Sequence, residues 1–366
     1  MGAYWILLIG ALVIVLQGAL FRRYALKRIA YSRSFKVSAC YEGEHFELVE
    51  TIENRKIVPV PWLRVESQFK AGLRFQGQLN LDISEGQFAQ NHKSFFSLMP
   101  WTKIVRRHDV TASRRGMYRL GTVSMTSGDL LGTGSAVLSL PLEGKLVVYP
   151  EPLDMAEMEM PVQTWMGETL VRRWIVQDPF YLSGVREYRE GDSLKDIHWK
   201  ASARTGELQV HRRDATADSR IVMYLNVEDH EHMWSRSTRP EPVEYGIRLA
   251  AGAAAELLSH GMEVGIGSNG MLEEEGGPFP GIPAAGGSEQ LSLILEYLAV
   301  LQLDRRLSFH EFLEGELVRL EGKYEVLLLT TYMNDRLEDV MAKYRAEGHN
   351  VMVHLLEEKA SHRKGA

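Results

Sequence analysis

The chain contains 366 residues, 45% of them hydrophobic and 25% charged, a length that predicts two or three domains and a composition that is ordinary for a globular protein. Its formal net charge is −6, but residues 1–41 hold six basic side chains and no acidic ones, so the remainder carries −12, and an acidic body argues against a nucleic-acid partner. The single cysteine, Cys40, excludes an internal disulfide and any cysteine-based zinc site.

The first predicted element is a membrane-spanning helix over residues 3–21. These nineteen residues contain no charge, and at about 1.5 Å per residue a helix of that length spans about 28 Å, close to the hydrocarbon thickness. Positive charge follows the apolar run, at Arg22 and Arg23, and no small-x-small site is evident, which favours an anchor over a cleaved signal peptide. Because basic residues beside a helix mark the cytoplasmic side, we expect a single-pass protein of the cell membrane with a cytoplasmic body.

Residues 35–150 are predicted to form an antiparallel β-sandwich. Short runs such as 35–39 and 46–50 alternate apolar with polar side chains, which is the period of a strand with one buried face. Turn-forming pairs, among them Glu42-Gly43 and Val58-Pro59, separate the runs. Many short strands divided by such turns are typical of two packed sheets.

The segment 184–213 combines charged and aromatic residues without the pattern of an ordinary helix. It reads G-x-R-x-Y-x-x-G-D, then I-x-W-K-x-S-A-R, then a strand-like L-x-V. This series resembles the signature of the bacterial family called domain of unknown function 58 (DUF58). The candidate residues of the segment are Arg186, Tyr188, Gly191, Asp192, Trp199, Lys200, Ser202 and Arg204.

Two interpretations of this segment are open. Its seven basic and five acidic side chains are nearly balanced, which favours internal pairing of Arg with carboxylates, with Tyr188 and Trp199 as packing anchors. The alternative is a surface that binds a partner or a ligand. The balance of charge does not suit nucleic acid, whose phosphates require an excess of Lys and Arg.

The resemblance also implies properties of the whole chain. It implies an N-terminal membrane segment, an immunoglobulin-like β domain and a C-terminal domain similar to von Willebrand factor A domains. It further implies association with a MoxR-type AAA+ ATPase in the assembly or maturation of other proteins, and with a neighbouring transglutaminase-like membrane protein.

Residues 219–366 are predicted to form an α/β domain, because strand and helix patterns alternate as in a parallel sheet covered on both faces. The predicted strands are 221–227, 263–267, 324–331 and 350–356, and the predicted helices are 243–259, 289–303, 309–320 and 336–347. The expected fold class is therefore an α+β multidomain chain. Its expected parts are a transmembrane helix and basic segment (1–34), a sandwich (35–150), the signature segment (151–218) and a doubly wound α/β domain (219–366).

A doubly wound sheet binds ligands at the carboxyl ends of its strands, where this chain places Asn226, Glu228, His230 and Thr331. A metal site of the von Willebrand type needs Asp-x-Ser-x-Ser after the first strand and a later Asp, whose oxygens suit a magnesium-like ion. None of those residues stands at its position here. The sequence thus predicts a degenerate site that holds no metal or cofactor and contacts a protein partner. The alternative is a metal-dependent hydrolase built on Glu228, Asp229, His230 and His232.

No catalytic residue is predicted. Ser202, His198 and Asp192 supply the chemistry of a nucleophile, a base and an orienter, but no nucleophile elbow or lysine–serine spacing surrounds them. A thiolate nucleophile is not expected at Cys40, which falls in a predicted strand. The sequence therefore favours a membrane-tethered, non-enzymatic protein-interaction module over the hydrolase.

Overall fold

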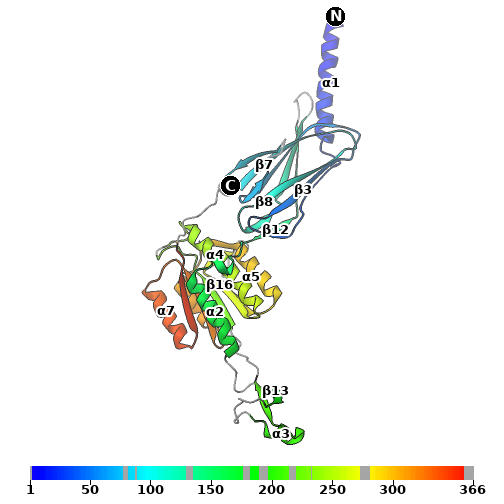
Figure 1. The fold of residues 1–366 in the computed structure, drawn as a ribbon. Coiled ribbons are helices and arrows are strands. Elements are labelled where there is room, and N and C mark those ends of the chain that lie inside the picture. Colours follow the sequence, from blue (N-terminus) through cyan, green and yellow to red (C-terminus); the bar gives the residue numbers. More distant parts are fainter. Residues whose placement is uncertain are drawn as a thin grey trace. The chain divides into compact units, whose positions relative to one another are not determined.

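Two units make up the chain, Met1–Glu151 and Pro152–Ala366. The structure, a computed structural model, describes residues 2–76, 81–86, 89–128, 135–175, 182–188, 197–213, 220–231, 233–272 and 281–357. Each unit contains its own β-sheets, as the ribbon in Figure 1 shows.

The predicted N-terminal helix is present as α1 (Gly2–Tyr24), but the prediction that it crosses a membrane is wrong. Among the helices that the structure describes, none is both long and apolar enough for a crossing. Several apolar side chains of α1, such as Leu8 and Leu12, are exposed. The single-pass topology and the placement of the body that followed from this helix are overturned with it.

Unit 1 is built from three sheets whose strands are antiparallel except for one pair. The first sheet has the order β1 (Ile29–Phe35), β3 (His45–Asn54), β8 (Lys103–Ala112), β5 (Leu73–Phe75). The second has the order β11 (Ser135–Pro141), β10 (Thr122–Gly128), β4 (Val60–Lys70), β7 (Ala89–Leu98), β6 (Leu81–Glu85). The third has the order β2 (Ala39–Tyr41), β12 (Lys145–Tyr149), β9 (Gly116–Arg119), and its β2–β12 pair is parallel.

The core of unit 1 lies where these sheets face each other. Strand β3 buries every second residue, as expected for a strand with one covered face. Its Ile52 packs with Leu63 of β4 and Met125 of β10, all fully buried. Side chains from different sheets thus share one apolar layer.

A group of buried polar side chains interrupts this layer. Arg33 of β1 and Glu50 of β3 are register partners, and their charged groups lie 3.3 Å apart with side-chain exposures of 2% and 0%. The Glu50 carboxylate also accepts a hydrogen bond from Tyr31 at 2.6 Å and contacts Nε2 of His108 at 3.3 Å. Arg33 in turn donates to Ser67 of β4 at 2.7 Å, so the group joins two sheets.

Unit 2 contains a five-stranded sheet with the order β18 (Ile282–Ala285), β16 (Glu263–Ser268), β15 (Arg220–Leu225), β20 (Tyr324–Thr330), β21 (Asn350–Leu355). All neighbours in it are parallel except β18, which is antiparallel to β16. Two further two-stranded sheets pair β13 (Leu182–Glu187) with β14 (Gln209–Arg213), and β17 (Gly270–Leu272) with β19 (Leu301–Arg305).

Helices cover both faces of the five-stranded sheet. On one face, Val222 and Tyr224 pack against α6 (Phe309–Leu317) and α7 (Asp335–Ala346). On the other lie α4 (Pro240–Ser259) and α5 (Ser288–Val300), with Gly246 of α4 close against Leu225. The remaining helical elements of the described chain are η1 (Met155–Glu157), α2 (Met160–Ile175) and α3 (Trp199–Thr205).

The expected α+β fold class is wrong for the chain as a whole. Strands hold more residues than helices in the described regions, so the protein is mostly β-sheet, and the expected membrane helix is not found. The sequence pattern also assigns residues 301–303 to a helix, which is wrong. Helix α5 ends at Val300, and the next five residues, Leu-Gln-Leu-Asp-Arg, begin by alternating apolar with polar and pair with β17 as a strand.

Candidate functional site

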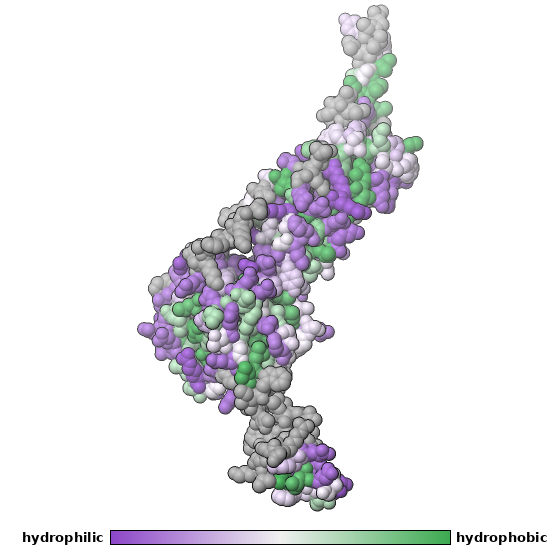
Figure 2. All heavy atoms as spheres, viewed as in Figure 1, coloured by the Kyte–Doolittle hydropathy of each residue, from purple (hydrophilic) through white to green (hydrophobic). Residues whose placement is uncertain are grey.

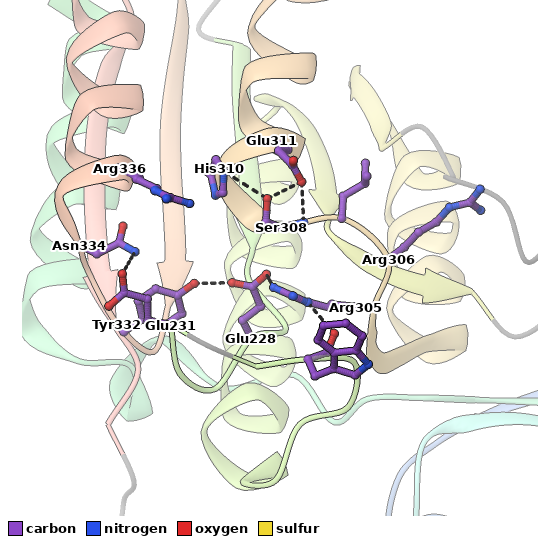
Figure 3. A pocket seen from close by; sticks show the side chains of 12 residues that line it. Glu228, Glu231, Arg305, Arg306, Ser308, His310, Glu311, Tyr332, Asn334 and Arg336 are labelled. Carbon is purple, nitrogen blue, oxygen red and sulfur yellow. Dashed lines mark hydrogen bonds and ion pairs between the residues drawn. The ribbon is translucent and has the colours of Figure 1, made fainter.

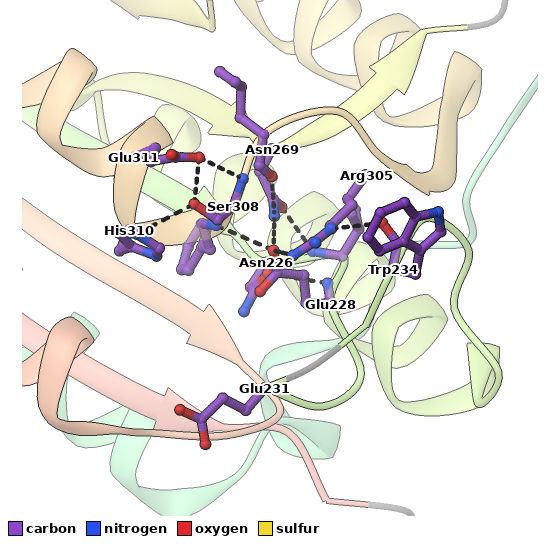
Figure 4. Close-up of polar contacts among 12 residues, drawn as sticks. Asn226, Glu228, Glu231, Trp234, Asn269, Arg305, Ser308, His310 and Glu311 are labelled. Carbon is purple, nitrogen blue, oxygen red and sulfur yellow. Dashed lines mark hydrogen bonds and ion pairs between the residues drawn. The ribbon is translucent and has the colours of Figure 1, made fainter.

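The carboxyl ends of β15, β16 and β20 meet at one edge of the parallel sheet (Figure 4). Asn226, the first residue after β15, is fully buried. Its side-chain amide donates to Thr330 Oγ1 at 3.0 Å, and its oxygen accepts from the backbone N–H of Glu228 at 3.0 Å. Asn226 therefore ties the end of β15 to the end of β20.

Glu228 is the centre of this edge, with 1% of its surface exposed. One carboxylate oxygen accepts from Arg305 Nη1 at 3.0 Å and from the Phe309 backbone N–H at 3.2 Å, and Asn269 Nδ2 lies 3.4 Å from it. The other oxygen accepts from the Tyr332 hydroxyl. Burial, together with this carboxylate, raises the pKa of Tyr332, so the hydroxyl stays a donor at neutral pH.

Asp229, the next residue, is committed to the loop that precedes α4. It accepts hydrogen bonds from the Thr238 and Arg239 backbone N–H groups, at 2.5 and 2.6 Å, and from the Ser237 and Thr238 hydroxyls, at 3.0 and 2.8 Å. Burial alone would raise the pKa of Asp229, but hydrogen bonds from Arg239, Thr238, His230 and Ser237 outweigh it and lower the pKa to about 2. The carboxylate is thus a charged structural acceptor.

The remaining predicted positions lie at the same edge. Thr331 donates through Oγ1 to the backbone carbonyl of Glu228 at 2.7 Å. His230 contacts Asp229 through Nδ1, and 45% of its side chain is exposed. His232, which belongs to the hydrolase hypothesis, lies outside the described residues.

A cavity of about 620 Å³ opens beside Glu228 (Figure 3). Its wall includes the start of α6, where Ser308 shares hydrogen bonds with Glu311, and the start of α7, where Asn334 donates to Glu231 at 3.0 Å. Trp234, 89% exposed, lines the cavity. Further lining residues are Arg305, Arg306, Leu307, His310, Tyr332 and Arg336.

The sequence pattern misses the residues that hold Glu228. Arg305 is the last residue of β19, a strand whose first three residues the pattern assigns to a helix. Tyr332 stands two residues beyond β20 with no motif around it. Only Ser308 carries a local signal, because Ser-Phe-His-Glu at 308–311 has the spacing of a capping box.

The donor set at this edge does not suit a metal ion. The Glu228 carboxylate already receives an arginine, a tyrosine and a backbone N–H, and the Asn226 oxygen already accepts from the backbone. Within the described ranges, no group of three or more His, Cys, Asp or Glu side chains has an arrangement that could hold a metal ion.

The signature segment is split by residues that the structure does not describe. Gly191 and Asp192 lie outside the described residues, and Arg186 lies in β13 with its side chain outside them. The segment resumes with α3, where Trp199, Lys200 and Arg204 are exposed and Ser202 is half-buried. Tyr188, also half-buried, donates through its backbone N–H to Leu208 at 2.9 Å.

The polar side chains of α3 serve its local structure. His198 accepts from the Ala201 backbone N–H at 3.0 Å through Nδ1, which caps the helix. Ser202 Oγ accepts from the Gln209 N–H at 2.8 Å and donates to the His198 carbonyl at 3.1 Å. Elsewhere, burial and the charge of Glu44 raise the pKa of the Cys40 thiol to about 11, which disfavours the thiolate.

The chain is similar at low sequence identity to a bacterial protein along most of its length. It is 21% identical over 363 residues to the uncharacterised protein YeaD of Bacillus subtilis (strain 168), covering 97% of this chain and 82% of that protein. It is similar in structure to a cohesin from Archaeoglobus fulgidus (10% identical, 32% of this chain and 90% of that one, TM-score 0.23). It is also similar in structure to a CARDB domain from Pyrococcus furiosus (15% identical, covering 32% of this chain and 90% of that one, TM-score 0.18). Residues 184–361, which include both α3 and the carboxyl edge of the sheet, match the family described as "Protein of unknown function DUF58".

Proposed function

We propose that this protein is a non-enzymatic interaction module that binds a protein partner at the cavity beside Glu228. The DUF58 resemblance supports a MoxR-type AAA+ ATPase as that partner, in the assembly or maturation of other proteins. The position also supports the proposal, because ligands of parallel sheets bind where the carboxyl ends of the strands meet.

The observation that carries this proposal is the saturation of Glu228. A catalytic or metal-binding carboxylate needs an oxygen that faces the substrate or the ion, whereas both oxygens of Glu228 are held by groups of the protein. The guanidinium of Arg305 supplies the positive charge that a buried carboxylate requires. The edge is therefore a rigid frame, and its exposed rim is the part that can meet a partner.

The same contacts weigh against the metal-dependent hydrolase. Asp229 is directed into the loop before α4 by four hydrogen-bond donors, and His230 is bonded to Asp229. A carboxylate already engaged by this many protein donors is poorly placed to bind a metal ion that activates water.

The test is the binding of the full chain to a purified MoxR-type ATPase on a sensor surface, with and without EDTA. We expect the affinity to be the same in both buffers. Trp234→Ala and Arg336→Glu, which change the exposed rim, should each weaken binding by about tenfold, or about 1.4 kcal/mol.

Arg345→Glu is the matched control, because Arg345 is exposed near the other end of α7. Replacing a basic side chain by an acidic one destabilises a helix at its C-terminus, where the helix dipole favours positive charge, and not at its N-terminus. Arg345→Glu therefore perturbs α7 at least as much as Arg336→Glu does. Binding that is lost in EDTA and restored by magnesium would contradict the proposal, as would equal effects of Arg336→Glu and Arg345→Glu.

A further inference from the structure

The DUF58 signature segment contains a small structural element, the α3 lobe, formed by β13, α3 and β14. Strand β13 pairs with β14 in antiparallel register, and Ile197 forms a bridge with Val210. Ile197 and Val210 are 6% and 1% exposed, so the lobe has a small buried centre. The Ser202 hydroxyl then links α3 to Gln209 at 2.8 Å.

The largest apolar side chain of this lobe is not used in that centre. Trp199 is 69% exposed, and Leu208 is 45% exposed. The His198 N–H donates to the Gln209 carbonyl at 2.7 Å, which places Trp199 and Leu208 one residue beyond this pair on the two facing segments. An exposed apolar side chain alone is ordinary, but an exposed tryptophan and an exposed leucine on two segments that are hydrogen-bonded to each other form a suitable anchor for a partner.

Basic side chains accompany this apolar pair. Lys200 and Arg204 are exposed on α3, and among the described residues no carboxylate pairs with either of them. Residues 197–213 contain four Lys and Arg against a single acidic residue, Glu207. Figure 2 shows hydrophobic beside hydrophilic residues on the visible face of the lobe.

We infer that the α3 lobe is a second protein-binding surface, on which Trp199 enters an apolar pocket of a partner whose rim carries carboxylates. The indole supplies apolar area at low entropic cost, while Lys200 and Arg204 contact the acidic rim. The fork of Arg204 suits a carboxylate in particular, since two parallel N–H donors match its two oxygens. This surface shares no residue with the lining of the cavity beside Glu228, so the two surfaces can be altered by different variants.

The experiment places a photo-crosslinking amino acid, p-benzoylphenylalanine, at position 199 of the full chain in the cells that produce it. The same replacement at Trp101 is the matched control, because Trp101 is 68% exposed in unit 1. We expect one protein to be cross-linked from position 199 and not from position 101. Mass spectrometry should locate the adduct in a segment of that protein rich in Asp and Glu.

Charge reversal then tests the stated chemistry of the partner. Lys200→Glu with Arg204→Glu should lower the yield of this adduct by about tenfold, as should about 1 M salt, which shortens the Debye length to about 3 Å. Lys93→Glu with Lys103→Glu, on exposed strand positions of unit 1, should not. Unchanged circular dichroism spectra and melting temperatures would show that each variant is folded.

Three results would overturn the inference. The first is an adduct yield at position 199 no higher than at position 101. The second is an adduct with another copy of this chain, with nucleic acid or with lipid in place of an acidic protein segment. The third is a protein adduct that survives both the charge reversal and high salt.

Discussion

Arg305 Nη1 lies 3.0 Å from Glu228 Oε1, and the two side chains have exposed fractions of 23% and 1%. They come from positions 77 residues apart, the loop after β15 and the end of β19. This ion pair therefore joins the parallel sheet to the β17–β19 ladder. It also sets the position of the first residues of α6, because the same carboxylate oxygen accepts from Phe309.

Arg305→Ala should lower the free energy of unfolding by about 3 kcal/mol, because it leaves a buried carboxylate without its cation. Glu228→Gln in the same background should restore part of that loss, since a neutral amide needs no counter-charge. Chemical denaturation of the single and double variants measures both effects. A double variant whose loss equals the sum of the single losses would show that the pair is not coupled.

Unit 1 should become less stable below neutral pH because of His92. This side chain is 1% exposed between Phe69 and Phe75, with ring centroids 4.7 and 4.3 Å away, and among the described residues neither ring nitrogen has a hydrogen-bond partner. Burial, with help from the positive charge of Arg33, lowers the pKa of His92 to about 3. As pH falls from about 6.5 toward 3, the imidazole of His92 is protonated in the unfolded chain but stays neutral in the folded one. The free energy of unfolding therefore decreases over this range.

The loss of stability caused by His92 can be separated from the loss caused by Glu50, because the two occur at different pH. Burial favours the neutral acid, but the hydrogen bond from His108, the charge of Arg33 and the Tyr31 hydroxyl lower the pKa of Glu50 to about 2. Its contribution is therefore lost only below about pH 4.5. Between pH 6.5 and 5 the wild type should lose about 2 kcal/mol in denaturant titrations, and His92→Phe should lose clearly less. Equal losses in both proteins would assign the effect to another group.

Asp229→Ala should destabilise unit 2 by about 3 kcal/mol, because the N–H groups of Thr238 and Arg239 and two hydroxyls lose a buried charged acceptor. His230→Ala should cost less than about 1 kcal/mol, since the side chain is 45% exposed and makes a single further contact with Asp229, through Nδ1. Thermal unfolding of the two variants checks the order. A larger loss for His230→Ala would mean that the histidine, and not the loop, holds Asp229.

Two glycines in helices should respond in opposite directions to alanine. A Cβ at Gly252 of α4 would lie 2.1 Å from the Leu153 carbonyl oxygen, so Gly252→Ala should cost about 1–3 kcal/mol through displacement of that segment. A Cβ at Gly315 of α6 would meet nothing within 4 Å, so Gly315→Ala should stabilise the protein by about 0.5–1 kcal/mol. The melting temperature of Gly252→Ala should lie below that of the wild type, and that of Gly315→Ala above it. A stabilising Gly252→Ala would show that α4 is not fixed against Leu153.

The local parts of the fold could be predicted from the sequence because their causes are local. Asn334 caps α7 by accepting from the Leu337 N–H at 3.0 Å, and Ser308 with Glu311 begins α6, as the capping patterns indicate. The position of the carboxyl edge at Asn226, Glu228 and Thr331 follows from parallel pairing in the same way.

The rest depends on contacts between distant segments, which single-sequence patterns do not contain. Arg305 and Tyr332 meet Glu228 only after β17 and β19 have paired. Strand β19 follows directly on the helical run of α5, and its short apolar–polar alternation does not by itself mark the residue at which the helix ends. The buried charges of unit 1 carry no signal either, since Arg33 and Glu50 stand in ordinary alternating strands.

The Arg33–Glu50 pair has a consequence for how β1 and β3 find each other during folding. The two residues are direct partners in the antiparallel register, with both side chains turned inward. A slip of one strand by a single residue turns its side chains to the opposite face, which would bring one charge to the surface and leave the other alone among Phe69 and the apolar core. An isolated buried charge is far less favourable than a paired one, so competing alignments of these strands are disfavoured even though their apolar alternation is similar. The ion pair thus favours one register of β1 and β3 over others that bury apolar side chains about equally well.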